Sequence, residues 1–137
     1  MILVDTSVWI GHLHAAEGRL VALLGDDEVG SHPLVLDELA LGSIKDRDVV
    51  LSSLGSLRSF PTITHDELLA LADGHRLWGR GLSAVDAHLL GSVALVAGGE
   101  MWTRDKRLMA AAADIGIASM AYTHPAQNPS GLSSARA

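Results

Sequence analysis

The sequence contains no cysteine, and this absence excludes several kinds of chemistry. A chain of 137 residues without cysteine has no disulfide, no thiolate zinc site and no cysteine nucleophile. It also has no run of eighteen apolar residues, so we expect no membrane span. No basic stretch precedes Ile2, and Asp5 interrupts the first apolar run, so we expect no signal peptide. Together these features lead us to expect a cytoplasmic protein.

Basic residues are in the minority. The chain has 10 Lys and Arg against 16 Asp and Glu, and its formal net charge is −6. This excess of negative charge argues against a protein that coats nucleic acid through bulk electrostatics. It does not exclude an enzyme that acts on nucleic acid, because a metal ion can neutralise acids gathered in one site. The apolar content of 48% indicates a globular chain, and its length fits one domain.

Short apolar runs alternate with helical patterns along the chain. Residues 2–4 are apolar throughout, which is typical of a strand buried on both faces. Further strands are predicted within 29–32, 60–63, 100–103 and 115–120. Helices are predicted at 7–14, 18–25, 34–41, 46–58, from 64 to the glycines near 80, at 83–97 and at 105–112. The alternation predicts an α/β fold of three layers, α/β/α, with a mostly parallel central sheet.

The end of the chain differs in composition from the rest. Residues 124–137 contain two prolines, three serines and no acid, and they lack periodic apolar positions. We therefore expect one domain over residues 1–123, followed by a disordered tail over 124–137.

Four acids differ from the others because each lies inside an apolar element or at its end: Asp5, Glu38, Asp86 and Asp105. Asp5 and Asp105 follow short apolar strands, and α/β sheets bind ligands just beyond the carboxyl ends of their strands. Buried together, four carboxylates would repel one another and lose their hydration. Mg²⁺ or Mn²⁺, which prefer oxygen ligands, would compensate for both effects.

Each of these acids also has a purely structural explanation. Asp86 is the third residue after Ser83, as in a capping box, and Asp105 can cap the helix that follows it. Asp37 competes with Glu38 for the inward position, because neighbours on a helix point about 100° apart. The residues by themselves leave both explanations open.

Four segments, taken together, resemble PIN-domain ribonucleases of the VapC type, the toxins of toxin–antitoxin pairs. They are residues 2–10 (ILVDTSVWI), 38–39 (EL), 83–90 (SAVDAHLL) and 102–108 (WTRDKRL), and they follow the family's order over about residues 1–122. The resemblance implies a PIN-like fold and an endoribonuclease that depends on Mg²⁺ or Mn²⁺. It also implies inhibition by a cognate antitoxin and, usually, a homodimer. The acidic quartet that binds metal and catalyses cleavage would be Asp5, Glu38, Asp86 and Asp105, and Thr103 would support the last acid.

Other polar residues near these motifs have less specific roles. Thr6 and Ser7 are candidate N-caps of the first helix or hydrogen-bond donors that support the site. Arg104 and Lys106 are candidates for phosphate contacts to RNA, and a solvated helix end explains them equally well. Two other functions stay open at this point. One is a phosphoryl-transfer hydrolase with Asp5 as nucleophile, although Ser7 occupies the position where that class usually has a second Asp. The other is a partner-binding module without enzymatic activity.

Apolar helices offer two sites of assembly. The helices predicted at 7–14, 18–25 and 46–58 carry more apolar surface than one small sheet needs, so we expect the antitoxin to bind there as a helix in a groove. We expect the homodimer contact to come from residues 64–97. Trp9 and Trp102 lie within apolar segments and are expected in the core.

Overall fold

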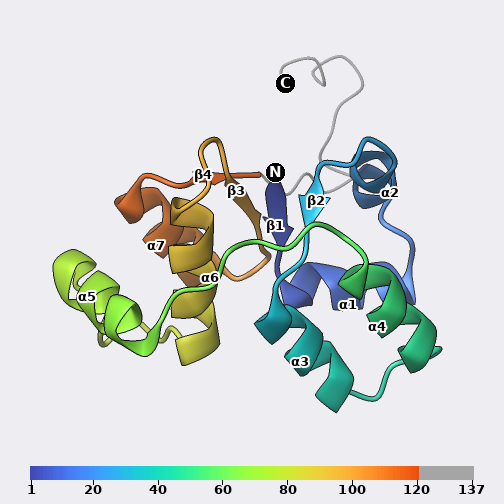
Figure 1. The fold of residues 1–137 in the computed structure, drawn as a ribbon, viewed down its shortest axis with the longest axis horizontal. Coiled ribbons are helices and arrows are strands. Elements are labelled where there is room, and N and C mark those ends of the chain that lie inside the picture. The colour runs from blue at the N-terminus through green and yellow to red at the C-terminus, as the bar shows by residue number, and fades with distance from the viewer. Residues whose placement is uncertain (121–137) are drawn as a thin grey trace.

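The computed structural model describes residues 1–120, which form a four-stranded sheet flanked by helices (Figure 1). The strand order is β2-β1-β3-β4, and every neighbouring pair is parallel. The strands are β1 (Ile2–Val4), β2 (Val29–Gly30), β3 (Glu100–Trp102) and β4 (Ala118–Ser119). The helices are α1 (Thr6–His14), α2 (Gly18–Gly25), α3 (Pro33–Leu41), α4 (Arg47–Gly55), α5 (His65–His75), α6 (Ala84–Ala94) and α7 (Lys106–Ile115). This architecture confirms the predicted three-layer α/β/α fold with a parallel sheet.

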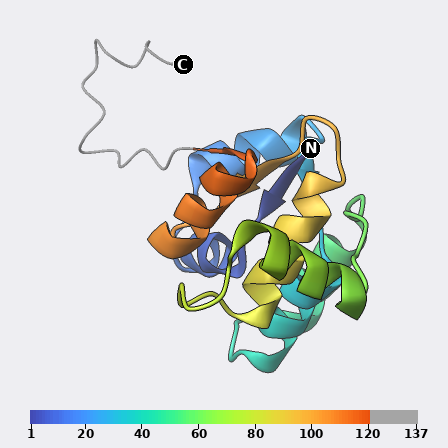
Figure 2. The ribbon, with the colours of Figure 1, turned by 90° about the vertical axis from the view of Figure 1, so that its left-hand side faces the viewer.

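The core is built around β1, which lies between β2 and β3. Leu3 and Val4 have no exposed surface, and Met101 and Trp102 on β3 are equally buried. Complete burial explains why β1 is apolar at every position instead of alternating. Helices α1 to α4 gather toward the β2 edge of the sheet and α5 to α7 toward the β4 edge (Figure 1), and α5 packs against α6 (Figure 2).

Several predicted elements differ from the structure; β2 spans only two residues, and α4 and α5 end earlier than predicted, at Gly55 and His75. Residues 60–63 form no strand; a single parallel bridge joins Ser31 to Ser59 just before them, and Pro61 has no N–H to continue the pairing. The last strand spans two residues because α7 continues to Ile115 and ends at Gly116, whose φ of +92° is readily adopted only by glycine. Helix α6 ends at Ala94, before the predicted residue 97.

The strand order creates a site between β1 and β3. The chain leaves β1 for β2 on one side and later returns past β1 to β3 on the other. Such a reversal opens a crevice beyond the carboxyl ends of the two strands, where parallel sheets bind ligands. None of the helices within residues 1–120 is long and apolar enough to cross a membrane. The predicted domain end at residue 123 and the predicted tail over 124–137 lie outside the described residues.

Candidate active site

Asp5 and Thr103 lie side by side at the carboxyl ends of β1 and β3. The register pairs Val4 with Trp102, and the Asp5 backbone N–H donates to the Trp102 carbonyl oxygen at 2.8 Å. The next residue of each strand therefore reaches the same point of the sheet edge. Both side chains are buried, with exposed fractions of 7% for Asp5 and 0% for Thr103. Sheet register thus joins two residues that are 98 positions apart in the chain.

The Asp5 carboxylate accepts hydrogen bonds through both oxygens. Oδ1 accepts from the Thr6 backbone N–H at 2.8 Å, which makes Asp5 the N-cap of α1. Oδ2 accepts from the Ser7 hydroxyl at 2.9 Å and the Thr103 hydroxyl at 2.8 Å. Such donors offset the loss of hydration that burial imposes on a carboxylate. Because Asp5 is the cap, the expectation that Thr6 or Ser7 caps α1 is wrong; both lie in its first turn.

Thr103 also connects Asp5 to Asp105. Its Oγ1 donates to Asp5 and accepts from the Asp105 backbone N–H at 3.0 Å. Asp105 is the N-cap of α7, where its Oδ1 accepts from the backbone N–H groups of Arg107 at 2.8 Å and Leu108 at 3.4 Å. The predicted capping role of Asp105 is therefore real, and it coexists with a position beside Asp5.

Glu38 joins this group through α1. The Thr6 hydroxyl donates to Glu38 Oε1 at 2.5 Å, so Thr6 contacts Asp5 with its backbone and Glu38 with its side chain. This contact distinguishes Glu38 from its neighbour Asp37. Glu38 is exposed, and Asp86 and Asp105 are half-buried. Asp5 alone of the four is buried, so the loss of hydration that would follow from burying all four carboxylates together applies to Asp5 only.

Asp86 forms the predicted capping box of α6. Its backbone N–H donates to the Ser83 hydroxyl at 3.1 Å, and its Oδ2 accepts from the Ser83 backbone N–H at 3.0 Å. The start of α6 lies at the lower end of the sheet in Figure 1, the end toward which β1 points. Within residues 1–120 the Asp86 carboxylate accepts only from Ser83, so no hydrogen bond joins it to the other acids.

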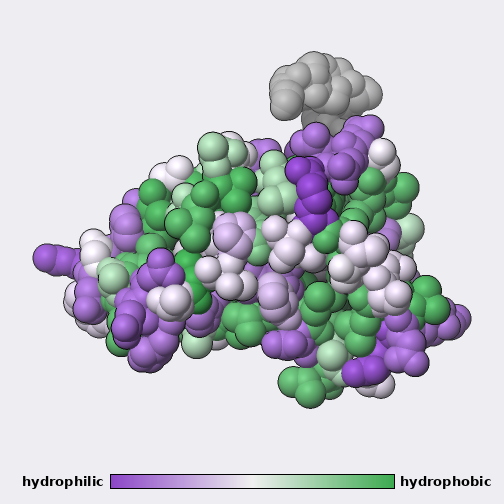
Figure 3. Space-filling view, in the orientation of Figure 1, coloured by the Kyte–Doolittle hydropathy of each residue, from purple (hydrophilic) through white to green (hydrophobic). Residues whose placement is uncertain are grey.

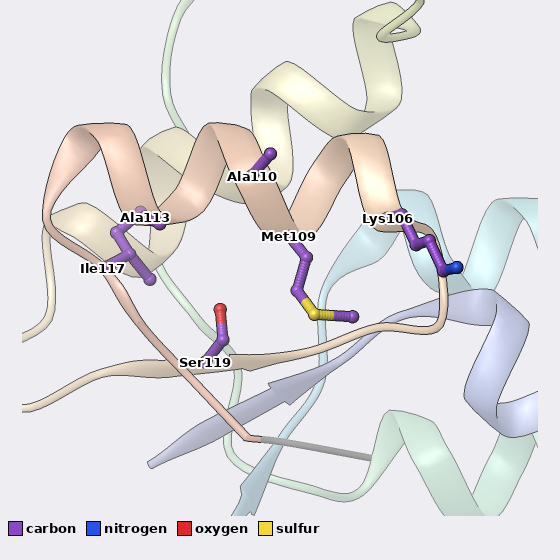
Figure 4. A pocket seen from close by; sticks show the side chains of 6 residues that line it. All are labelled: Lys106, Met109, Ala110, Ala113, Ile117 and Ser119. Carbon is purple, nitrogen blue, oxygen red and sulfur yellow. The ribbon is translucent and has the colours of Figure 1, made fainter.

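The basic residues around Asp105 point in different directions. The Arg104 guanidinium lies against Gly11 and 3.7 Å from Glu17 Oε2, over α1. Lys106 lines a hollow of about 410 Å³ between α7 and β4 together with Met109 and Ile117 (Figure 4). The phosphate-binding roles of Arg104 and Lys106 stay predictions. Arg107 was missed by the sequence reasoning, although its Nε lies 3.9 Å from Asp105 Oδ1; its place two residues after the cap was the available signal.

A buried histidine links the two helices that bear Glu38 and Asp86. His32 is 1% exposed. Its Nδ1 accepts from the Leu34 N–H at 3.0 Å and so caps α3. Its Nε2 lies 2.9 Å from the Ser92 hydroxyl of α6. Since Nδ1 accepts, Nε2 carries the proton and donates to Ser92. Burial lowers the pKa of His32, the charge of His88 lowers it further, and Asp37 acts in the opposite direction. The histidine directly before Pro33 was a signal for this cap that sequence reasoning did not use.

The chemistry of the site is that of oxygen donors. Carboxylates and hydroxyls from the starts of α1, α6 and α7, from the middle of α3 and from the ends of β1 and β3 suit a hard cation such as Mg²⁺ or Mn²⁺. Within residues 1–120, however, the structure contains no group of three or more Asp, Glu or His side chains close enough together to hold a metal ion. The residues present thus fit the metal in donor type. Thr6 connects Asp5 to Glu38 through its N–H and its hydroxyl, and the Thr103 hydroxyl connects Asp5 to the backbone of Asp105.

The chain is similar to known proteins in both sequence and fold. The PIN domain family model matches residues 2–114. Ribonuclease VapC32 of Mycobacterium tuberculosis, from strains CDC 1551 / Oshkosh and ATCC 25618 / H37Rv, is 70% identical over 118 residues, which cover 86% of this chain and 95% of the relative.

Two solved structures have a similar fold. FitAB bound to an IR36 DNA fragment has a TM-score of 0.58 and 20% identity, covering 91% of this chain and 99% of that chain. FitAcB from Neisseria gonorrhoeae has a TM-score of 0.59 and 21% identity, covering 88% and 97%. At this level of identity the likeness concerns the fold alone.

Proposed function

Because this chain belongs to the PIN-domain family, as a relative of the VapC-type ribonucleases, we propose that it is a metal-dependent endoribonuclease and the toxin of a toxin–antitoxin pair. The observation that supports this best is the second oxygen of Asp5. Capping of α1 uses only Oδ1, whereas Oδ2 is held by Ser7 and by Thr103 from a distant strand. A cap alone does not need this second set of donors, but a metal-binding carboxylate needs a fixed orientation.

In this proposal the quartet of Asp5, Glu38, Asp86 and Asp105 holds one or two Mg²⁺ or Mn²⁺ ions. The bound metal would supply an activated water and stabilise negative charge on the scissile phosphate. The rest of the work falls to the chain itself. Ser7 and Thr103 orient the Asp5 carboxylate, and Thr103 fixes the backbone of Asp105 beside it. We place the activity in the cytoplasm, on RNA substrates.

The antitoxin would bind over α1, α2 and α4. These helices surround a hollow of about 300 Å³ whose lining is mostly apolar and includes Trp9, Leu13, Leu24 and Leu57. Val49 on its rim is 66% exposed, and Figure 3 shows hydrophobic surface at the lower right, over α3 and α4. An amphipathic helix of the antitoxin would cover this surface.

A symmetric homodimer would form through α5 and α6. A second hollow, of about 350 Å³, lies between these helices and is lined by Ile63, Leu71 and Leu95 among others. Leu69 and Leu95 are 47% and 57% exposed. A face of this kind suits an isologous contact, the commonest in soluble assemblies. Light scattering at micromolar concentration tests it, and a monomer throughout that range contradicts it.

The test of the enzymatic function is Asp105→Asn. Asparagine is nearly as good an N-cap as aspartate, so α7 should begin as before. Asp5→Asn is the less selective change, because its amide nitrogen would replace an oxygen that accepts from two hydroxyls. We expect purified protein to cleave total RNA with Mg²⁺ and not with EDTA. Asp105→Asn should keep its unfolding midpoint in EDTA, lose cleavage, and lose most of the stabilisation by Mn²⁺.

The matched control is Asp66→Asn, which removes one exposed charge from the first turn of α5. It should leave cleavage and the response to Mn²⁺ unchanged. Full cleavage by Asp105→Asn, with an unaltered response to Mn²⁺, would show that the acids are caps and would remove the proposed function. Stable protein without any Mg²⁺-dependent cleavage of RNA would have the same consequence.

A further inference from the structure

Trp78 is the one tryptophan of this chain that lies at the surface. It is 65% exposed, whereas Trp9 and Trp102 are 4% and 1% exposed. Single apolar residues are common on protein surfaces, so exposure alone means little. Trp78 differs because its neighbour Leu77 is buried, at 5% exposed, and donates its N–H to the Ala72 carbonyl oxygen at 3.0 Å. The chain is thus anchored next to an aromatic ring that faces solvent.

The loop that bears Trp78, residues 76–82, has a defined shape. Arg76, Gly79 and Gly81 have φ values of +52°, +73° and +78°. A non-glycine residue in this region is uncommon, and the glycines adopt it without a steric cost. Three such positions within six residues turn the chain sharply between α5 and α6.

The loop rests on α7, the helix that begins at Asp105. A Cβ atom at Gly81 would lie 2.6 Å from Arg107 Nη1 and 3.1 Å from its Cδ, so the Arg107 side chain lies against the Gly81 backbone. Arg80 Nη1 forms an ion pair with Asp114 Oδ2 at 2.8 Å. Arg107 in turn has its Nε 3.9 Å from Asp105 Oδ1.

The other end of the loop leads to a second acid. Ser83 follows residue 82 directly and caps α6 in the box that contains Asp86. The loop is therefore continuous with the start of α6 and in contact with the start of α7. The loop therefore lies at the edge of the acid site, between the helix starts that bear Asp86 and Asp105.

Three arginines gather at this loop in a chain whose net charge is −6. Arg76 belongs to the loop, Arg80 pairs with Asp114, and Arg107 lies against Gly81 and 3.9 Å from Asp105. An exposed aromatic ring among arginines is the arrangement that binds single-stranded nucleic acid: arginines contact phosphates, and the ring stacks on a base. An apolar protein partner would not need the arginines.

We propose that Trp78 stacks on an unpaired base of the RNA that flanks the cleaved phosphate, and that Arg107 and Arg76 contact the neighbouring phosphates. This inference rests on the proposed ribonuclease function and specifies how its substrate is held. Trp78 then contributes to substrate binding and leaves the chemical step to the acids.

The experiment uses a single-stranded RNA 20-mer of mixed sequence and the emission of Trp78. In EDTA, the RNA should quench the exposed tryptophan fluorescence of the native protein. Trp78→Ala should bind this RNA about 5- to 150-fold more weakly, the range expected for one base–aromatic stack. Trp78→Phe should recover most of the affinity because it retains a ring. With Mg²⁺, Trp78→Ala should raise KM by a similar factor and leave kcat nearly unchanged.

Val21→Ala is the matched control, since Val21 is an exposed apolar side chain on α2 and lies outside the proposed dimer face. It should leave RNA affinity unchanged. If Trp78→Ala binds RNA within twofold of the native protein, the stacking role is refuted even where native cleavage is normal. If Trp78→Ala becomes monomeric or loses a protein partner with RNA affinity intact, the loop is a protein interface and the inference fails. Absence of Mg²⁺-dependent cleavage by the native protein instead refutes the ribonuclease function itself.

Discussion

Replacement of Thr103 by valine tests the connection between the two strand ends most directly. Valine has nearly the shape of threonine, so Thr103→Val removes one hydroxyl from a side chain with no exposed surface. Two hydrogen bonds are lost: the bond to the Asp5 carboxylate at 2.8 Å and the bond from the Asp105 N–H at 3.0 Å.

The expected cost follows from these two bonds. A hydrogen bond to a charged group contributes about 1.5–3 kcal/mol, and a buried N–H left without an acceptor costs about 1 kcal/mol or more. Thr103→Val should therefore lower the free energy of unfolding by about 2–4 kcal/mol, a large part of the total for one domain. Thr103→Ser keeps the hydroxyl and loses one methyl group, which costs about 1 kcal/mol.

Urea unfolding measures this difference. The midpoint should fall further for Thr103→Val than for Thr103→Ser, with similar m-values. In an Asp5→Asn background the cost of Thr103→Val should shrink by about 0.5–3 kcal/mol, since one partner of the bond has already changed. If valine and serine cost the same, or if the cost is independent of Asp5, the Asp5–Thr103 bond does not stabilise the site.

Two further predictions concern the core. His32 has a lowered pKa in the fold, so the unfolded chain binds its proton more readily, and stability should fall as the pH drops below about 6.5. His32→Asn, which keeps a capping oxygen, should flatten this dependence in unfolding measured across this pH range; identical pH profiles would show that His32 is not responsible. A Cβ at Gly30 would lie 2.6 Å from Phe60 Cε1 and 2.7 Å from Met1 Sδ. Gly30→Ala should therefore lower the free energy of unfolding, measured by urea titration, by about 1–3 kcal/mol, and Phe60→Leu should recover part of that loss. If Gly30→Ala is as stable as the native protein, the Phe60 ring moves freely.

Local features of this fold could be predicted from the sequence. The apolar run before Asp5 gave the central strand, and the spacing of Thr64 to Glu67 and of Ser83 to Asp86 gave two capping boxes that the structure contains. Each of these features depends on residues within four positions of one another. Propensity and hydrogen bonding within one turn are sufficient to specify them.

Features that depend on distant residues could not be predicted in this way. The preference for Glu38 over Asp37 is expressed through Thr6, 32 positions away, and the bond from Thr103 to Asp5 requires the β1–β3 register. The contact of Gly81 with Arg107 likewise arises only when α6 and α7 are in place. The sequence identified the candidate acids and named Thr6, Ser7 and Thr103 as supporting residues, but not which atoms these hydroxyls contact.

The pairing of β1 with β3 also bears on when the site can form during synthesis. Asp5 leaves the ribosome well before its partner Thr103, which is made 98 residues later. Until β3 has emerged, the first strand has only β2 beside it, and one of the two hydroxyls that hold Asp5 Oδ2 does not yet exist. Long-range strand pairing of this kind is also slow to form. A nascent chain is therefore without the assembled acid site until β3 and Thr103 have been translated, and the proposed activity cannot begin before that point.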